Sequence, residues 1–97
     1  MMSFLDFFRR KKVEDEAARR SRLLLTGRIA EGSVLDITCD DSGTPTHIFF
    51  TYSIHDVDYE ASQTLTQEQR GRQQTYAPGA NITVRYDPHR PGNSVVV

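Results

Sequence analysis

The stretch HIFFTYSIHDVDYEA, residues 47–61, decides the fold. Its first half alternates apolar and polar residues with the period of two that is typical of a β-strand, and the apolar side chains that share one face are Ile48, Phe50, Tyr52 and Ile54. A second alternating run of Val57, Tyr59 and Ala61 follows after only two residues, His55 and Asp56. Asp tolerates the left-handed φ that a two-residue turn requires. The stretch therefore predicts a β-hairpin whose Ile48 face enters the core.

Further strands are predicted on both sides of this hairpin. Upstream, Leu25, Gly27 and Ile29 alternate with polar residues, as do Leu35, Ile37 and Cys39, and Gly32-Ser33 between the two runs indicates a bulge or bend. We therefore expect one long bent strand or two short ones. Downstream, the sequence predicts strands at Ile82, Val84 and Tyr86 and at residues 95–97, separated by a loop with two prolines at residues 87–93. Residues 62–76 are rich in Gln, Thr, Ser and Arg, which predicts a polar edge segment or a mobile loop.

The first 22 residues have the signals of a charged amphipathic helix. Ser3 and Asp6 fit a capping box, and Met2 and Phe7 fit a hydrophobic staple. We expect the helix to end near residues 20–22, so the chain divides into a helix at 1–22 and a small β-barrel-like domain at 23–97. The predicted fold is mainly β (α+β), a small five- to six-stranded antiparallel barrel or sandwich with one N-terminal α-helix.

Residues 76–95, YAPGANITVRYDPHRPGNSV, carry a more specific pattern. They resemble the closing signature of a bacterial family, the domain of unknown function 3592, and the resemblance extends over residues 23–97. The positions that match its proline-glycine turn, its Tyr-Asp-Pro strand end and its second proline are Pro78, Gly79, Tyr86, Asp87, Pro88 and Pro91. The resemblance implies a β fold and a bacterial origin, and no activity. Members of that family often carry flanking transmembrane helices, whereas the longest apolar runs here are three residues.

A structural role explains this motif without a ligand. Pro78-Gly79 suits a turn whose second residue has a positive φ, and Pro88 and Pro91 stiffen the loop between two strands. Asp87 can accept hydrogen bonds from amides of its own loop. We therefore interpret the motif as structural and favour this over a binding role.

The residue types of the common catalytic and metal sites are not arranged in their usual patterns. The three histidines and the single Cys39 lack metal-ligand spacing, and the glycines form neither a nucleophile elbow nor a phosphate-binding loop. A barrel of this size fills its interior with side chains. The sequence predicts no enzyme activity, no cofactor, no metal and no small-molecule substrate. Residues 23–97 carry nine acidic against five basic residues, which argues against nucleic-acid binding.

The N-terminus is the place where we expect a contact with a partner. Four apolar residues precede four cations there, Phe4, Leu5, Phe7 and Phe8 followed by Arg9, Arg10, Lys11 and Lys12. This pattern fits a segment that docks on the β domain or a self-association patch, and it also fits an interfacial membrane anchor. We predict a non-catalytic protein-interaction module of a bacterial cell, with a protein partner or a homodimer. The alternative is a peripheral membrane accessory protein.

The expected location is the cytoplasm, with the inner face of the membrane as the site in the alternative case. One cysteine allows no intramolecular disulfide, which favours a reducing compartment. The apolar run within residues 1–8 is too short for a signal peptide, and the basic run follows it instead of preceding it. We therefore expect no export signal.

Overall fold

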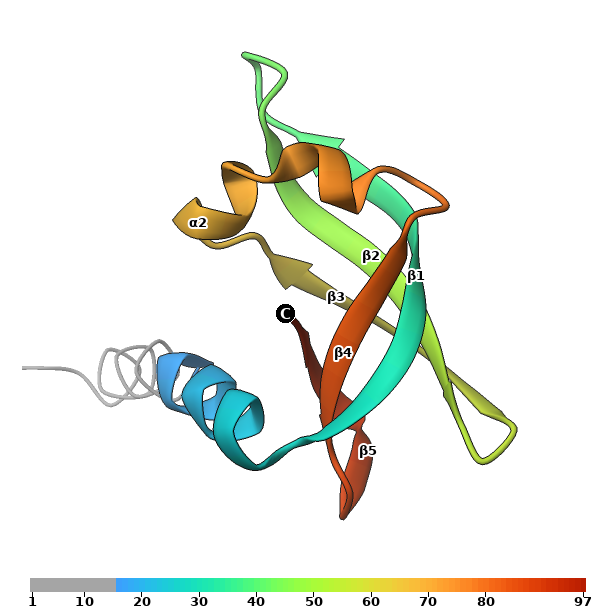
Figure 1. Ribbon diagram of the computed structural model, residues 1–97. Helices are drawn as coiled ribbons and strands as arrows, with labels where there is room; N and C mark the ends of the chain where they lie inside the picture. Colours follow the sequence, from blue (N-terminus) through green and yellow to red (C-terminus); the bar gives the residue numbers. More distant parts are fainter. Residues whose placement is uncertain (1–15) are drawn as a thin grey trace, which may run out of the picture.

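The computed structural model describes residues 16–97, which form a short helix followed by a curled sheet (Figure 1). The described part of the N-terminal helix covers residues 16–26. The elements after it are β1 (Arg28–Cys39), β2 (Pro45–Ile54), β3 (Val57–Thr64), α2 (Gln67–Arg70), a 3-10 helix η1 (Gln73–Tyr76), β4 (Asn81–Asp87) and β5 (Arg90–Val96).

The strands form one five-stranded sheet in the order β3-β2-β1-β4-β5, and every pair of neighbours is antiparallel. β1 is the central strand, and its ladders with β4 and with β2 overlap only at Gly32 and Ser33. A Cβ built on Gly32 would lie 2.5 Å from the carbonyl oxygen of Thr51, so only glycine allows β2 to approach this closely. The predicted mainly β fold is confirmed, with five strands in a nearly closed barrel.

The two edge strands, β3 and β5, meet where the barrel closes. A Cβ built on Gly92 would lie 3.9 Å from Cδ1 of Tyr59, and four residues further along both strands Gln63 bonds to Val96. The residue numbers rise together, so β3 and β5 lie side by side in parallel. No backbone ladder joins them, and we call this line of contact the seam.

The core fills the interior of the barrel. The predicted hairpin is confirmed, because Ile48, Phe50, Tyr52 and Ile54 are all buried and the turn residues His55 and Asp56 have φ values of 49° and 66°. Four strands and the segment after β3 contribute to the buried cluster, which comprises Val34, Ile48, Phe50, Tyr52, Ile54, Leu65, Tyr76, Ile82, Val84, Tyr86 and Val96. The remaining strand, β3, packs the partly buried Tyr59 and Ala61 against it.

The predicted boundary between helix and strand was wrong. The helix continues to residue 26, and β1 begins at Arg28. Leu23 is the helical residue that is buried, whereas Leu25 and Ile29 are 83% and 61% exposed. The period of two seen around these residues arose where the end of a helix meets the start of a strand, and it did not mark a buried strand face.

The predicted shared face of Leu35, Ile37 and Cys39 was wrong for Leu35 and Cys39, whereas Ile37 is half-buried and packs against the core. The register against β2 shifts between Val34 and Asp36, so Leu35 is an extra, exposed residue, and Cys39 is exposed as well. The bulge lies beyond the predicted Gly32-Ser33. An inserted residue changes the phase of a strand, so residues on either side no longer alternate in one sequence-wide pattern.

The glutamine-rich segment is ordered and covers one end of the barrel (Figure 1). β3 continues through Thr64 as an edge strand, and α2 and η1 follow it. Leu65, Gln69 and Tyr76 are each no more than 2% exposed. The prediction of a polar edge segment is therefore confirmed up to Thr64, and the alternative of a mobile loop is wrong for the residues that follow. The loop at 87–93 is also shorter than expected, because β5 begins at Arg90 and carries Pro91 on the sheet edge, where a missing N–H is tolerated.

Candidate functional site

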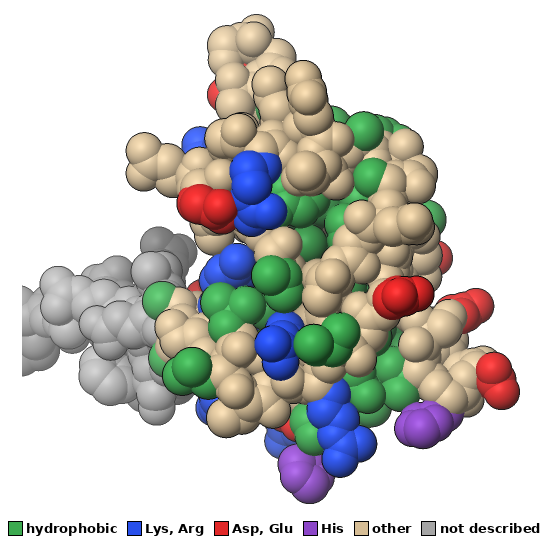
Figure 2. Space-filling view, viewed as in Figure 1, with side chains coloured by type: hydrophobic (Ala, Val, Ile, Leu, Met, Phe, Trp, Pro, Cys, Tyr) green, Lys and Arg blue, Asp and Glu red, His purple; other side chains and the backbone are tan. Residues whose placement is uncertain are grey.

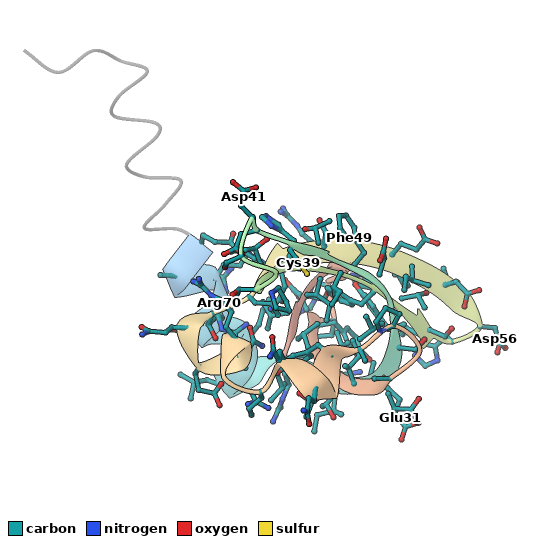
Figure 3. The ribbon with its side chains drawn as sticks, turned by 90° about the horizontal axis from the view of Figure 1, so that it is seen from above. Glu31, Cys39, Asp41, Phe49, Asp56 and Arg70 are labelled. Carbon is teal, nitrogen blue, oxygen red and sulfur yellow. The ribbon has the colours of Figure 1, made fainter. Side chains whose placement is uncertain are left out.

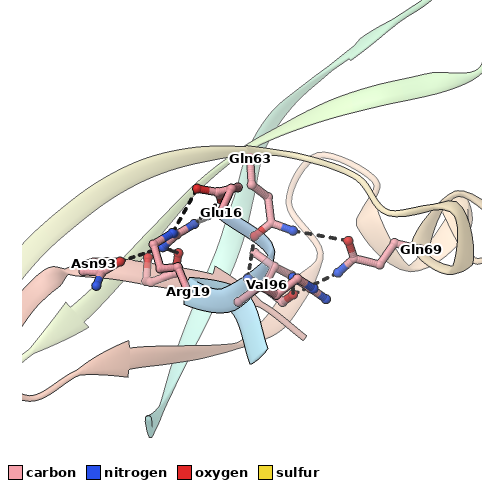
Figure 4. A network of polar contacts seen from close by, with 8 residues as sticks. Glu16, Arg19, Gln63, Gln69, Asn93 and Val96 are labelled. Carbon is pink, nitrogen blue, oxygen red and sulfur yellow. Dashed lines mark hydrogen bonds and ion pairs between the residues drawn. The ribbon is translucent and has the colours of Figure 1, made fainter. Parts of the chain in front are cut away.

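Two glutamines bridge the seam between β3 and β5 (Figure 4). The Oε1 atom of Gln63 accepts a hydrogen bond of 2.8 Å from the backbone N–H of Val96. Gln69 is fully buried, and its Nε2 atom donates to the carbonyl oxygen of Val96 at 2.9 Å. The two side chains also bond to each other at 3.2 Å. Side-chain amides therefore replace part of the missing ladder.

The same amide of Gln69 holds α2 in place. Its Oε1 atom accepts from the backbone N–H of Thr66 at 3.0 Å, while the hydroxyl of Thr66 accepts from the N–H of Gln69 at 3.1 Å. These two bonds form a capping box at the start of α2. One buried side chain thus ties the cap of a helix to the last strand of the barrel.

The N-terminal helix binds to β5 through two arginines (Figure 4). Nη1 of Arg19 lies 2.6 Å from Oδ1 of Asn93 and 3.1 Å from the carbonyl oxygen of Ser94. Nη1 of Arg20 lies 3.1 Å from the carbonyl oxygen of Val96. Arg19 is itself held by Glu16 at 2.6 Å. These cations satisfy carbonyl groups of an edge strand that no backbone ladder joins to another strand on that side.

An apolar contact accompanies these bonds. Val95 lies between the two carbonyl groups that the arginines bind, on the face opposite to Ser94 and Val96, and it is 1% exposed. Leu23 of the helix is 2% exposed, and neither residue belongs to the interior cluster. The helix therefore covers the outer face of β5 and docks on the β domain over its described residues.

A groove of about 660 Å³ runs beside this helix, above the seam. One wall is helical, the other belongs to the end of β3, and Val95 lies in the floor; the lining residues are Glu16, Ala17, Arg20, His47, Ser62, Gln63, Thr64, Leu65, Thr66 and Val95. Most of its exposed lining is apolar. We call this hollow the seam groove, and its volume lies within the range of ligand-binding pockets.

The edge of β3 turns hydrogen-bonding groups toward this groove. The N–H of Leu65 bonds to the carbonyl oxygen of Thr46, and this bond continues the β2–β3 ladder and sets its phase. Residues 57, 59, 61 and 63 of β3 therefore point their backbone groups at β2, and residues 58, 60, 62 and 64 point theirs outward. The outward set is Asp58, Glu60, Ser62 and Thr64, so the uncharged half of the edge borders the groove and the acidic half continues toward the hairpin tip.

The predicted structural motif has the geometry that its residue types indicate. The N–H of Ala80 bonds to the carbonyl oxygen of Ala77 at 2.9 Å around Pro78-Gly79, and Gly79 has a φ of 87°. The N–H of Gly79 also bonds to the carbonyl oxygen of Val34 at 2.8 Å, which attaches this turn to β1.

The second half of the motif forms the β4–β5 turn. Oδ1 of Asp87 accepts from the N–H of His89 at 2.8 Å across Pro88, and the carbonyl oxygen of Pro91 accepts from the Tyr52 hydroxyl at 2.7 Å. Tyr86 is buried in the interior cluster. The motif therefore joins the turns at both ends of β4 to β1 and β2.

A second hollow, of about 550 Å³, lies between the end of the helix and the β4–β5 turn. Its lining includes Arg22, His89 and Arg90, and also the carboxylate of Asp87. The two arginines are exposed and the carboxylate stands among them, so the hollow has no single charge character. Figure 2 likewise shows basic and acidic side chains scattered among apolar ones on this face.

Four titratable groups of the described residues have shifted pKa values: Glu68 and Arg72, which pair with each other on the surface, and Tyr52 and Asp40. Burial raises the pKa of Tyr52, whose hydroxyl lies inside the barrel. The pKa of Asp40 is lowered by a hydrogen bond from the Ser42 side chain and by the backbone N–H of Thr44 in the β1–β2 loop. Both groups serve the fold. Within residues 16–97, His, Cys, Asp and Glu side chains form no group of three or more that could hold a metal ion.

The predicted contact residues at positions 4–12 lie outside the described residues. The chain enters the described region at Glu16, which lines the seam groove. None of the helices within residues 16–97 has the length and apolar character needed to cross a bilayer. Sequence reasoning missed Arg19, Arg20, Gln63 and Gln69 as the residues that build the groove and the seam. The one signal for them was the Thr66-x-x-Gln69 spacing of a capping box.

Comparison with known proteins agrees with the resemblance seen in residues 76–95. The model of the family described as domain of unknown function (DUF3592) matches residues 26–97, from the last residue of the helix through the end of the chain. No curated protein and no solved structure matches the chain. The matched region holds all five strands, the seam glutamines and the Pro78–Pro91 motif, and the chain belongs to the family of the domain of unknown function 3592.

Proposed function

We propose that this protein is a non-catalytic protein-interaction module of the bacterial cytoplasm, and that residues 4–12 together with the surface around the seam groove make the contact. The observation that carries the proposal is the docking of the N-terminal helix across β5, which places Glu16 at the groove. In the sequence, only three residues separate Glu16 from the apolar and basic segment at 4–12.

The filling of the barrel supports a role without catalysis. Tyr52 and Phe50 stack at a centroid distance of 5.9 Å inside it, and Tyr52 stacks on Tyr59 at 5.5 Å. The two hollows described above lie on the outside, among exposed side chains of mixed charge. A perturbed acid or base in a cleft would favour catalysis, whereas none of the shifted groups lines either hollow; these groups are Tyr52, Asp40, Glu68 and Arg72.

The outer surface argues for a protein partner over nucleic acid. Partly open five-stranded barrels of the oligonucleotide-binding type use the face of strands 2 and 3. On this face β3 presents Asp58 and Glu60 and the hairpin tip presents Asp56, which Figure 3 shows projecting outward. Carboxylates repel a phosphate backbone, and Phe49 is the one aromatic residue on this outer face within β2 and β3.

Light scattering on the full chain and on a variant lacking residues 1–12 tests the proposal. We expect the full chain to associate, with itself or with a partner added at known concentration, and the shortened chain to remain monomeric. If both forms are monomeric and no partner distinguishes them, the proposal is wrong. The shortened chain retains every contact described above, so a loss of folding is readily excluded by circular dichroism.

The second candidate function is a peripheral membrane accessory at the inner face of the membrane. It rests on the order of residues at the N-terminus, where the aromatic group precedes Arg9, Arg10, Lys11 and Lys12. Each cation near an anionic surface contributes about 1 kcal/mol. Co-sedimentation with vesicles that contain phosphatidylserine distinguishes the two functions. Binding by the full chain that is lost without residues 1–12 supports the membrane role, and both forms remaining in the supernatant excludes it.

A further inference from the structure

We infer that the seam groove and the acidic edge of β3 receive residues 4–12 of a second copy of this chain. This inference rests on the proposed function and names the partner and its receptor. Phe4, Leu5, Phe7 and Phe8 of one copy lie in the groove of the other, and the basic run lies against Asp58 and Glu60. The two copies exchange segments, so a two-fold dimer contains the contact twice.

The first support is the match of chemistry in order along the edge. From Leu65 toward Asp58, β3 borders a mostly apolar groove and then carries two exposed carboxylates, Glu60 and Asp58, of which Asp58 also accepts a hydrogen bond from the Ser53 hydroxyl. From Phe4 toward Lys12, the segment presents apolar side chains and then four cations. The two orders coincide when the segment runs antiparallel to β3. Matched charges give register and specificity to such a contact more than they give affinity.

The second support is the unpaired edge itself. Ser62 and Thr64 turn their backbone N–H and C=O groups outward beside the groove, and within the described residues these groups have no backbone partner. Exposed strand edges are places where other chains bind. β5, the opposite edge, already has its outward groups occupied by Arg19, Arg20, Gln63 and Gln69. Of the two edges, the β3 edge at Ser62 and Thr64 is therefore the one whose backbone groups are open to a partner.

The order of the chain favours a second copy over the same copy. Glu16 lines the groove, and in the sequence the basic run is nearer to Glu16 than the apolar residues are. To place both groups on their matching surfaces, one chain would have to reverse direction within residues 9–12. Those residues are Arg-Arg-Lys-Lys, without the Gly, Pro, Asn or Asp that tight turns use. A segment from another copy needs no reversal.

The size of the contact suits a stable dimer. Each copy contributes the nine residues 4–12, and it receives its partner's segment on the ten residues of the groove and the two carboxylates. The total of about twenty residues from each copy is that of a standard protein interface.

A charge-reversal series on the full chain tests the inference by sedimentation equilibrium. Glu60→Lys should weaken the dimer at least about tenfold, because the contact occurs twice and an attraction becomes a repulsion. Glu60 makes no side-chain bond within the described residues, so the substitution leaves the fold intact. Glu31→Lys is the matched control, since Glu31 is an exposed acid on β1, on a different side of the molecule from the β2–β3 hairpin tip (Figure 3). It should leave the dimer constant within twofold.

Rescue makes the test specific. Combining Arg10→Glu and Lys11→Glu with Glu60→Lys should recover most of the lost affinity, whereas the two segment substitutions alone should weaken the dimer. Equal effects of Glu60→Lys and Glu31→Lys would overturn the inference. If the dimer is lost without residues 1–12 but is insensitive to Glu60→Lys, the inference is wrong and the proposed function stands. The two N-terminal segments would then contact each other. A chain that is monomeric in solution and binds only phosphatidylserine vesicles would overturn both.

Discussion

Replacing Gln69 with alanine should destabilise the protein by about 3 kcal/mol, although glutamine is a common surface residue. Its side chain makes three hydrogen bonds, to the N–H of Thr66 at 3.0 Å, to Nε2 of Gln63 at 3.2 Å and to the carbonyl oxygen of Val96 at 2.9 Å. Each such bond contributes about 1 kcal/mol net, and a buried group left without a partner costs about 1–3 kcal/mol. Val96 keeps its bond from Arg20, so the N–H of Thr66 and the Nε2 group of Gln63 are the donors that lose their partner.

Urea unfolding followed by circular dichroism measures this loss directly. Gln67→Ala is the matched control, because Gln67 is exposed on the same short helix and should change the free energy of unfolding by less than about 0.5 kcal/mol. Gln69→Leu keeps most of the side-chain volume and removes the hydrogen bonds, so it separates the contribution of the bonds from that of packing. If Gln69→Ala and Gln67→Ala have equal effects, the glutamine bridge does not close the barrel and the description of the seam is wrong.

Three further predictions concern the turns and the titratable groups. Gly79→Ala should cost about 1–2 kcal/mol in thermal unfolding, because its φ of 87° is unfavourable for any residue with a Cβ, and Gly79→Asn should cost less. Tyr52→Phe should cost about 1 kcal/mol through the lost bond to Pro91. Because burial raises the pKa of Tyr52 above its ordinary 10.0, stability should fall as the pH rises past 10.0, and Tyr52→Phe should remove that part of the alkaline loss in a pH series of urea unfolding. The pKa of Asp40 is lowered from 3.8 by the Ser42 side chain, so its contribution is present above pH 3.8 and lost as the pH falls through the lower folded value; Asp40→Asn should flatten this acid limb, and an unchanged limb would contradict it.

The parts of the fold that were predictable from sequence are those with a local cause. The β2–β3 hairpin has an unbroken period of two and a two-residue turn, and both are properties of adjacent residues. The Pro78-Gly79 turn is local in the same way. By contrast, Leu25 and Ile29 follow a period of two across a junction between a helix and a strand, where the pattern has no single meaning.

The parts that were not predictable depend on partners far along the chain. Gln69 is buried because Val96, 27 residues later, offers a carbonyl group at the seam. Arg19 looks like a solvent-exposed helical residue paired with Glu16, yet it also binds Ser94, 75 residues away. Polar side chains that close a barrel have the same composition as polar side chains on a surface, so only the tertiary structure distinguishes them.

The candidate contact shows the same division. The apolar and basic character of residues 4–12 can be read from the sequence, and it indicates that something is bound there. The groove that would receive such a segment is formed by the helix, β2, β3 and β5 together, and no local pattern predicts it.

Intermolecular paramagnetic relaxation measures the central contact most directly. A full chain carrying Met2→Cys and Cys39→Ser is spin-labelled at position 2 and mixed with an equal amount of ¹⁵N-labelled natural chain; Cys39 is exposed, so its replacement is mild. The account predicts broadening of amide signals at Ser62, Thr64 and Thr66, beside the groove, and none at Glu31. Broadening confined to the amides of residues 1–12 of the ¹⁵N-labelled chain, or no broadening at all, would contradict the proposed contact.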